Sequence, residues 1–128
     1  MPALAVTDHG VMYGAVAFYK ACRKAGIKPI IGCEVYVAPR SLHDKEHLLD
    51  RDYSHLILLC RNEEGYHNLC RLVSTSFIDG FYVKPRIDWA LLHQHAEGSS
   101  VSPAVCGGIL PSASFAATMT RQSARRWS

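Results

Sequence analysis

Four side chains of types that bind metals or transfer protons stand at or beside short apolar runs of this 128-residue sequence. Asp8 and His9 follow the run "ALAVT", Glu34 stands within "IIGCEVYV", and His55 opens "HLILLC". In α/β folds, strand ends hold working residues rigidly while the loops beyond them stay open to a ligand. Imidazole nitrogen and carboxylate oxygen are good ligands for zinc, manganese or iron. The pattern is therefore compatible with a divalent-metal site built from strand ends.

Each of these residues also has a purely structural interpretation. Adjacent residues on an extended chain point to opposite faces, so Asp8 and His9 need not bind one ion. One of them can bind a metal while the other anchors the strand end or a neighbouring ligand. Alternatively, Asp8 caps the turn after the strand, and His55 is a hydrogen-bonded histidine in a half-buried strand. Taken residue by residue, the pattern favours the structural interpretation and leaves both open.

The elements that must position these residues alternate along the chain. Apolar and β-branched runs predict strands at residues 3–7, 30–37 and 54–60, the first of them covered on both faces. Helical spacing predicts helices at residues 14–24 and 62–77, and a short helix beginning near Asp88. Residues 38–52 are polar and irregular, which predicts a loop. This order indicates an α/β fold.

Composition limits the class of protein. A content of 48% hydrophobic and 20% charged residues is typical of one globular domain, and the net charge of +3 permits contact with phosphate without requiring it. No apolar run is long enough to span a membrane, and no signal peptide is evident, so we expect a cytoplasmic protein. The five cysteines form no CxxC pair, which favours reduced thiols over disulfides.

The composition changes after Gly98. Residues 99–128 are rich in Ser, Ala and Arg, contain no Asp or Glu, and show no sustained helical or strand period. Reading the codons one nucleotide earlier can restore an amphipathic string that begins "LIGLSGCLRGD", in which the codons of Met119 and Thr120 force an aspartate. We therefore expect residues 99–128 to be an out-of-frame, disordered tail.

The remaining sequence resembles a known family. The segments "TDHGVMYG", "AGIKPIIGCEVYV" and "NEEGYHNL" occur in the order found in the PHP (polymerase and histidinol phosphatase) domain of bacterial replicative DNA polymerase III alpha subunits. The resemblance covers residues 1–98, about three quarters of the chain. It implies part of a distorted β/α barrel that holds up to three metal ions at the C-terminal ends of its strands. In some relatives this domain is a metal-dependent 3′–5′ exonuclease, and in others it is structural.

The family's motifs transfer to individual residues. The acid–histidine motif falls on Asp8 and His9, a strand-end glutamate falls on Glu34, and a later histidine falls on His55. The resemblance therefore implies that His9, Glu34 and His55 bind a divalent metal, zinc or manganese, while Asp8 lies behind them. The other histidines match no motif and are expected in loops or on helix faces: His43, His47, His67, His93 and His95.

The chain also departs from the family pattern. It lacks the opening His-x-His pair, the late Asp-x-His motif and the polymerase region, so we expect Met1 to be an internal methionine of a longer protein. The expected organisation is a partial PHP domain at residues 1–98 followed by the tail. We expect a polymerase fragment that is inactive alone, binds metal weakly or not at all, and meets DNA and other replicase subunits through its parent protein, with no membrane partner. The alternatives are a free-standing PHP phosphoesterase and a non-catalytic PHP scaffold.

Overall fold

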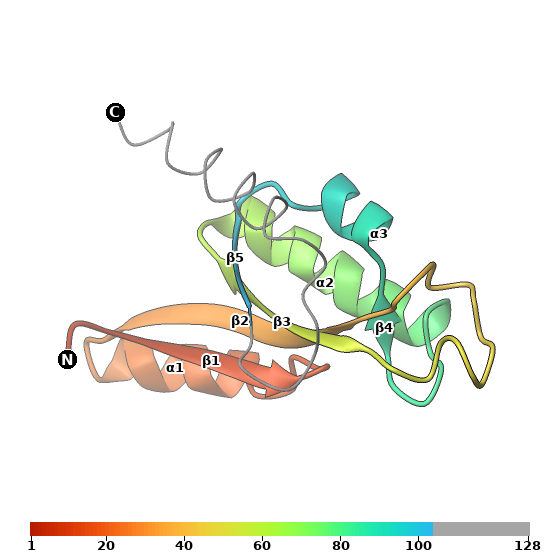
Figure 1. The fold of residues 1–128 in the computed structure, drawn as a ribbon. Coiled ribbons are helices and arrows are strands. Elements are labelled where there is room, and N and C mark those ends of the chain that lie inside the picture. Colours follow the sequence, from red (N-terminus) through yellow and green to blue (C-terminus); the bar gives the residue numbers. More distant parts are fainter. Residues whose placement is uncertain (104–128) are drawn as a thin grey trace.

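The computed structural model describes residues 1–103 of the chain, which alternate between strands and helices (Figure 1). In chain order the elements are β1 (Ala3–His9), α1 (Ala15–Lys24), β2 (Lys28–Val37), β3 (Ser54–Cys60), α2 (Glu63–Ile78), β4 (Arg86–Ile87), α3 (Trp89–Gln94) and β5 (Ser99–Pro103). The predicted order of the larger elements is confirmed. None of the helices within residues 1–103 combines the length and the apolar character that crossing a membrane requires.

The strands form one mixed sheet in the order β1-β2-β3-β5, with β4 added beside β2. β1 and β4 run parallel to β2, whereas β3 runs antiparallel to β2 and to β5. Residues 38–53, which join β2 to the reversed β3, contain no helix or strand, as predicted. The α/β class is confirmed, and within the described residues the sheet is open rather than closed into the barrel that the resemblance implies.

Two short strands share one edge of β2. β1 pairs with β2 as far as His9 opposite Glu34, and β4 starts with Arg86 opposite Tyr36. The other edge of β2 is occupied there by β3, so β4 must continue along the edge that β1 leaves. The C-terminal end of β1 and the N-terminal end of β4 therefore meet on this edge.

The helices cover one face of the sheet. The hydrophobic core joins alternate residues of β2 and β3, such as Val35 and Leu58, to Leu69 and Leu72 of α2 and to Leu92 of α3. α1 packs along β1 and β2, while α2 packs on β3 and β4 (Figure 1). Because side chains alternate along a strand, Glu34 and Tyr36 of β2 point to the opposite face from this core.

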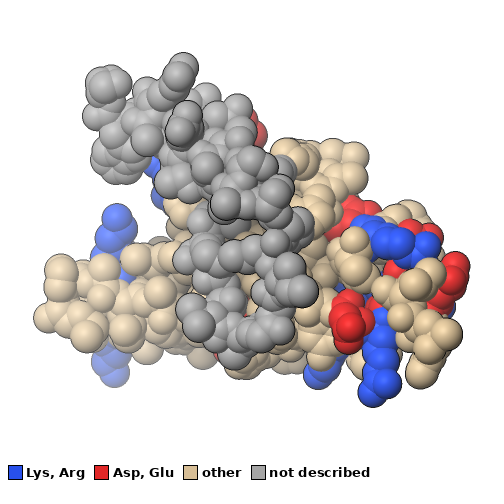
Figure 2. Space-filling model, viewed as in Figure 1, with Lys and Arg blue, Asp and Glu red and all other residues tan. Residues whose placement is uncertain are grey.

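A buried arginine organises the long segment between β2 and β3. Arg86 is 0% exposed, and its guanidinium donates to the backbone carbonyls of Gly80, Asp50, Leu42 and Asp44. Charged side chains gather over this end of the molecule (Figure 2), where Arg40 forms a salt bridge with Asp50 and another with Glu46. The loop at residues 38–53 is thereby tied to β4.

Side-chain caps begin two of the helices. The Asn62 side chain accepts from the amide of Gly65 at the start of α2, and the Asp88 side chain accepts from the amide of Leu91 at the start of α3. Asp88 also accepts from the amide of Leu42 in the loop. Caps of this kind satisfy amides that have no partner within the helix, which explains why both helices begin where the sequence predicts.

Two expectations are corrected by the structure. β1 is an edge strand with exposed Leu4, Ala5 and His9, so it is not covered on both faces. A disordered tail was predicted from residue 99 onward, but residues 99–103 form β5, which pairs with β3. Main-chain pairing to an open sheet edge needs no apolar period, so sequence pattern did not reveal it. The rest of the predicted tail, residues 104–128, lies outside the described residues.

Candidate metal centre

The three predicted metal ligands come together, with both histidines beside the carboxylate of Glu34. The Oε1 atom of Glu34 lies 2.6 Å from Nδ1 of His55, and its Oε2 atom lies 3.0 Å from Nδ1 of His9. These residues, here called the Glu34 cluster, are separated by 25 and 21 positions in the sequence. Strand pairing therefore creates the cluster, because nothing in the local sequence brings the three side chains together.

The register of the sheet explains this convergence. In the parallel pair β1–β2, His9 stands opposite Glu34, which places both side chains on the same face. In the antiparallel pair β2–β3, His55 stands opposite Tyr36, so His55 and Glu34 are diagonal neighbours on that face. The side chain of Glu34 is 13% exposed and that of His9 is 73% exposed. The cluster thus runs from a largely buried carboxylate to an imidazole that is open to solvent.

Both imidazoles turn Nδ1 toward the carboxylate. A carboxylate offers only acceptors, so Nδ1 of His55 donates to Glu34, while Nδ1 of His9 lies in ion-pair contact with it at 3.0 Å. In neutral imidazoles this tautomer leaves the lone pair on Nε2. Metal-binding histidines commonly have this arrangement, in which the nitrogen that does not bind the metal donates to a carboxylate or carbonyl oxygen.

Asp8 lies apart from the cluster and supports the turn that follows β1. Its Oδ2 atom accepts from the backbone amide of Gly14 at 3.0 Å, immediately before α1. This contact matches the turn-capping interpretation of Asp8. Cys33, which stands opposite Asp8 in the register, is buried on the core side of the sheet. Burial raises the pKa of the Cys33 thiol to about 12. A backbone hydrogen bond with Gly10 opposes this rise, and the nearby Asp8 and Glu34 carboxylates add to it.

An aromatic group borders the Glu34 cluster. The ring centroids of Tyr36 and His55 are 5.1 Å apart, and the Tyr53 ring lies 5.1 Å from Tyr36 and 5.5 Å from His55. Burial, followed by the nearby Glu34 carboxylate, raises the pKa of Tyr36. Gly10 packs closely against the Tyr36 ring, since a Cβ atom there would lie 2.9 Å from Cε2 of Tyr36. These contacts fix the walls of the cluster on the side facing β4.

These flanking residues were not predicted from the sequence, although alternation along the strands contained a signal for them. Tyr36 is two positions after Glu34, and Tyr53 is two positions before His55, so each shares the face of the residue it precedes or follows. The histidines that matched no motif lie in the loop at residues 38–53, on α2, on α3 or at its C-terminal cap, as predicted. Cys22, Cys33, Cys60 and Cys70 are free thiols, also as predicted.

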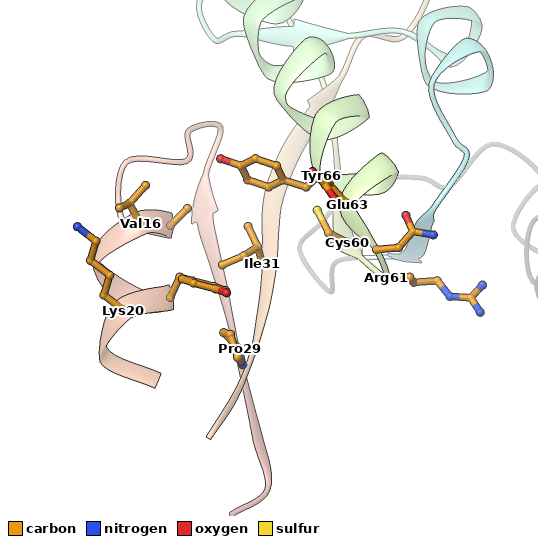
Figure 3. A pocket seen from close by; sticks show the side chains of 11 residues that line it. Val16, Lys20, Pro29, Ile31, Cys60, Arg61, Glu63 and Tyr66 are labelled. Carbon is orange, nitrogen blue, oxygen red and sulfur yellow. The ribbon is translucent and has the colours of Figure 1, made fainter. Parts of the chain in front are cut away.

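A separate groove lies on the core side of the sheet, between α1 and the start of α2 (Figure 3). Its volume is about 590 Å³. Ile31 and Pro29 form its floor, and Val16 of α1 faces Tyr66 of α2 across it. Ile31 and Glu34 differ by an odd number of positions along β2, so the groove and the Glu34 cluster occupy opposite faces of the sheet.

Comparison with known proteins identifies the family. The family model described as "PHP domain" matches residues 1–126. This chain belongs to the PHP domain family. Proteins named DNA polymerase III subunit alpha match it closely: that of Chlamydia trachomatis serovar D is 53% identical over 116 residues, covering 90% of this chain. That of Chlamydia pneumoniae is 60% identical over 99 residues and covers 77% of the chain. That of Thermus aquaticus is 48% identical over 112 residues and covers 86% of the chain.

The resemblance to the PHP domain of polymerase III alpha subunits is therefore confirmed. The chain spans only 9%, 8% and 9% of the length of these three relatives. The match to the PHP family model extends past Gly98, so the out-of-frame origin of residues 99–128 stays a prediction.

Proposed function

We propose that this chain is part of the PHP domain of a replicative DNA polymerase III alpha subunit, and that His9, Glu34 and His55 contribute to its divalent-metal site. The observation that supports the site is the Glu34 carboxylate, which lies 2.6 Å from Nδ1 of His55 and 3.0 Å from Nδ1 of His9. The relatives named DNA polymerase III subunit alpha support the wider function. In the parent protein, DNA and other replicase subunits are the proposed partners.

The donor set fits a divalent ion of intermediate softness, such as zinc or manganese. It offers two imidazoles and one carboxylate, which are ligands that such ions accept. Among residues 1–103, no group of three or more His, Cys, Asp or Glu side chains is already spaced as a metal site. The Nδ1 contacts with Glu34 suit histidines that bind through Nε2, so Glu34 either orients the imidazoles or exchanges these contacts for the ion. When bound, the ion supplies Lewis-acid polarisation of a phosphoryl oxygen.

The residues of this chain provide only part of a phosphoesterase site. Glu34 holds two imidazoles in place from a largely buried position, and Asp8 fixes the turn after β1 through the Gly14 amide. Two-metal phosphoryl transfer needs enough ligands to fix both ions against an in-line oxygen. Three residues do not supply them. We therefore expect this chain to bind metal weakly and to hydrolyse phosphoesters no faster than background.

Paramagnetic broadening by Mn²⁺ tests the metal site even when binding is weak. Substoichiometric Mn²⁺ is added to the ¹⁵N-labelled full chain, and loss of amide signal is mapped along the sequence. Broadening is expected first at residues next to the cluster, such as Gly10, Val35 and Leu56. The changes His9→Ala and Glu34→Gln should each reduce this local broadening at least fivefold. His67→Ala is the matched control, because His67 is an exposed histidine that also contacts a glutamate, Glu63.

The outcomes separate the candidate functions. Equal broadening in wild type, His9→Ala and Glu34→Gln, or broadening only around the acidic loop at residues 44–52, would reject the proposed metal site and leave the scaffold function. Metal-stimulated hydrolysis of bis(p-nitrophenyl) phosphate that disappears in His9→Ala would instead identify a free-standing phosphoesterase. Local broadening without hydrolysis is the expected result.

A further inference from the structure

The turn before β4 brings a lysine to the edge where the Glu34 cluster lies. β1 ends at His9, and β4 begins on the same edge of β2 only two register positions further on. The contacts of Gly10 show how close the two ends are: a Cβ atom there would lie 2.9 Å from Tyr36 and 3.2 Å from Cγ of Pro85. Lys84 immediately precedes Pro85, which brings its backbone to this edge of the sheet.

The backbone of this turn is held in a costly conformation. Val83 has φ +64°, a region that β-branched residues rarely adopt, and Tyr82 pairs with Lys84 across it. A hydrogen bond holds the segment before this turn, because Arg86 donates from Nε to the carbonyl of Gly80 at 3.1 Å. Strain of this kind persists only where surrounding contacts impose it, and it is concentrated at sites with a function. The hydrogen bond from Arg86 anchors the segment that leads into this turn.

The Lys84 ammonium lies over the ring of Tyr36 and is exposed to solvent. Its Nζ atom lies 5.7 Å from the centroid of the Tyr36 ring, and the residue is exposed. Tyr36 is two residues beyond Glu34 on the same face of β2, about 7 Å along the strand. The aromatic contact therefore holds the ammonium near the Glu34 cluster without neutralising its charge.

We propose that Lys84 binds a non-bridging oxygen of a phosphodiester whose phosphorus faces the Glu34 cluster. The inference rests on the proposed function, since it assigns the anionic substrate group of the same site. A lysine is suited to this role as a compact positive charge with three donors. Its contribution does not require a metal, because attraction between an ammonium and a phosphate is independent of the ion. Lys84 thus acts as a binding residue for the phosphate.

The test uses the dinucleotide thymidylyl-(3′,5′)-thymidine as the probe, because it contains a single phosphodiester. The full chain is titrated in EDTA and low salt, and the amide shifts of Gly10, Tyr36 and Lys84 report binding. Lys84→Gln is expected to weaken binding about two- to fivefold, as befits one exposed ion pair. It should also make binding less sensitive to salt concentration, because one screened charge pair is lost. Lys84→Arg should stay within twofold of wild type.

Lys28→Gln is the matched control. Lys28 is an exposed lysine at the opposite end of β2, about 20 Å from Glu34 along the strand. Equal binding by Lys84→Gln and Lys28→Gln would overturn the proposal, as would equal binding of thymidine, which has no phosphate. Inorganic phosphate should compete with the probe for the wild-type chain. It should compete less well for Lys84→Gln, because Lys84 binds the phosphate group itself. The metal-free conditions keep this result separate from the Mn²⁺ experiment, so either proposal can fail alone.

Discussion

Replacing Arg86 with methionine should destabilise the fold strongly. Arg86 is fully buried and donates to four backbone carbonyls at 2.9 to 3.3 Å. Three of these carbonyls belong to residues 42–50 and the fourth belongs to Gly80, so one side chain joins two loops to β4. Methionine keeps most of the volume but has no donor. The substitution therefore isolates the contribution of the hydrogen bonds from that of packing.

The size of the loss follows from the fate of the four carbonyls. A hydrogen bond to a charged group contributes about 1.5–3 kcal/mol, and an acceptor left buried without a partner costs about 1–3 kcal/mol. These values do not add in full, because a loop can move and water can reach some of its carbonyls. Removing one member of a buried charged network costs about 3–5 kcal/mol. We expect Arg86→Met to lower the free energy of unfolding by about 4 kcal/mol.

Urea unfolding followed by circular dichroism measures this loss. Arg86→Lys keeps the charge and three of the donors, so it should lose about half as much as Arg86→Met. Arg71→Met is the control, because Arg71 is exposed on α2, and it should change the free energy of unfolding by less than about 0.5 kcal/mol. A loss below 1 kcal/mol for Arg86→Met would refute the reasoning. If Arg86→Met does not fold, the lysine variant still decides, because its loss of about 2 kcal/mol must clearly exceed that of the Arg71→Met control.

Two further predictions concern the surroundings of the Glu34 cluster. Gly10 and Gly26 both have positive φ, +69° and +70°, but only a Cβ atom on Gly10 would meet neighbours within 4 Å. Gly26→Ala should therefore lower the free energy of unfolding by about 1 kcal/mol, from backbone strain alone. Gly10→Ala should lower it by about 2–3 kcal/mol, because Tyr36 and Pro85 must also shift. Equal urea midpoints for the two variants would contradict this. The raised pKa of Cys33, about 12, means that its thiolate is scarce at pH 8.5. Peptide mapping after iodoacetamide treatment should show Cys33 alkylated on the order of a hundredfold more slowly in the folded chain than in urea, and comparable rates would show that the thiol is not buried.

Local sequence signals were sufficient to predict the main elements. The run "SHLILLC" coincides with β3, and the acidic start of the second helix follows Asn62, whose side chain caps it. Asp88 was predicted near the start of a short helix and is its N-terminal cap. These signals are strong because they depend on neighbours within a few positions, where propensity, capping and alternation act together.

The candidate site was predicted in part, for an identifiable reason. His9, Glu34 and His55 were selected because each stands at or beside an apolar run, and strand register then brings them together. No local pattern encodes the pairing partner of β4, which is only two residues long, or the burial of Arg86 within "KPRID". The role of Lys84 depends on both. Residues whose importance arises from a distant pairing were therefore the ones that sequence reasoning missed.

The arrangement links stability to the proposed site through β4. The same strand pairs with β2 beside the Glu34 cluster, holds the buried Arg86, and follows the turn that presents Lys84. Loosening Arg86 would free Gly80 and the turn after it, and this would displace the ammonium before it disturbed the three cluster residues, whose positions depend on β1, β2 and β3. Phosphate binding and metal binding should thus respond differently to the same change in the loop. The residues proposed for phosphate binding and for metal binding both lie at the edge of β2 that β1 and β4 share.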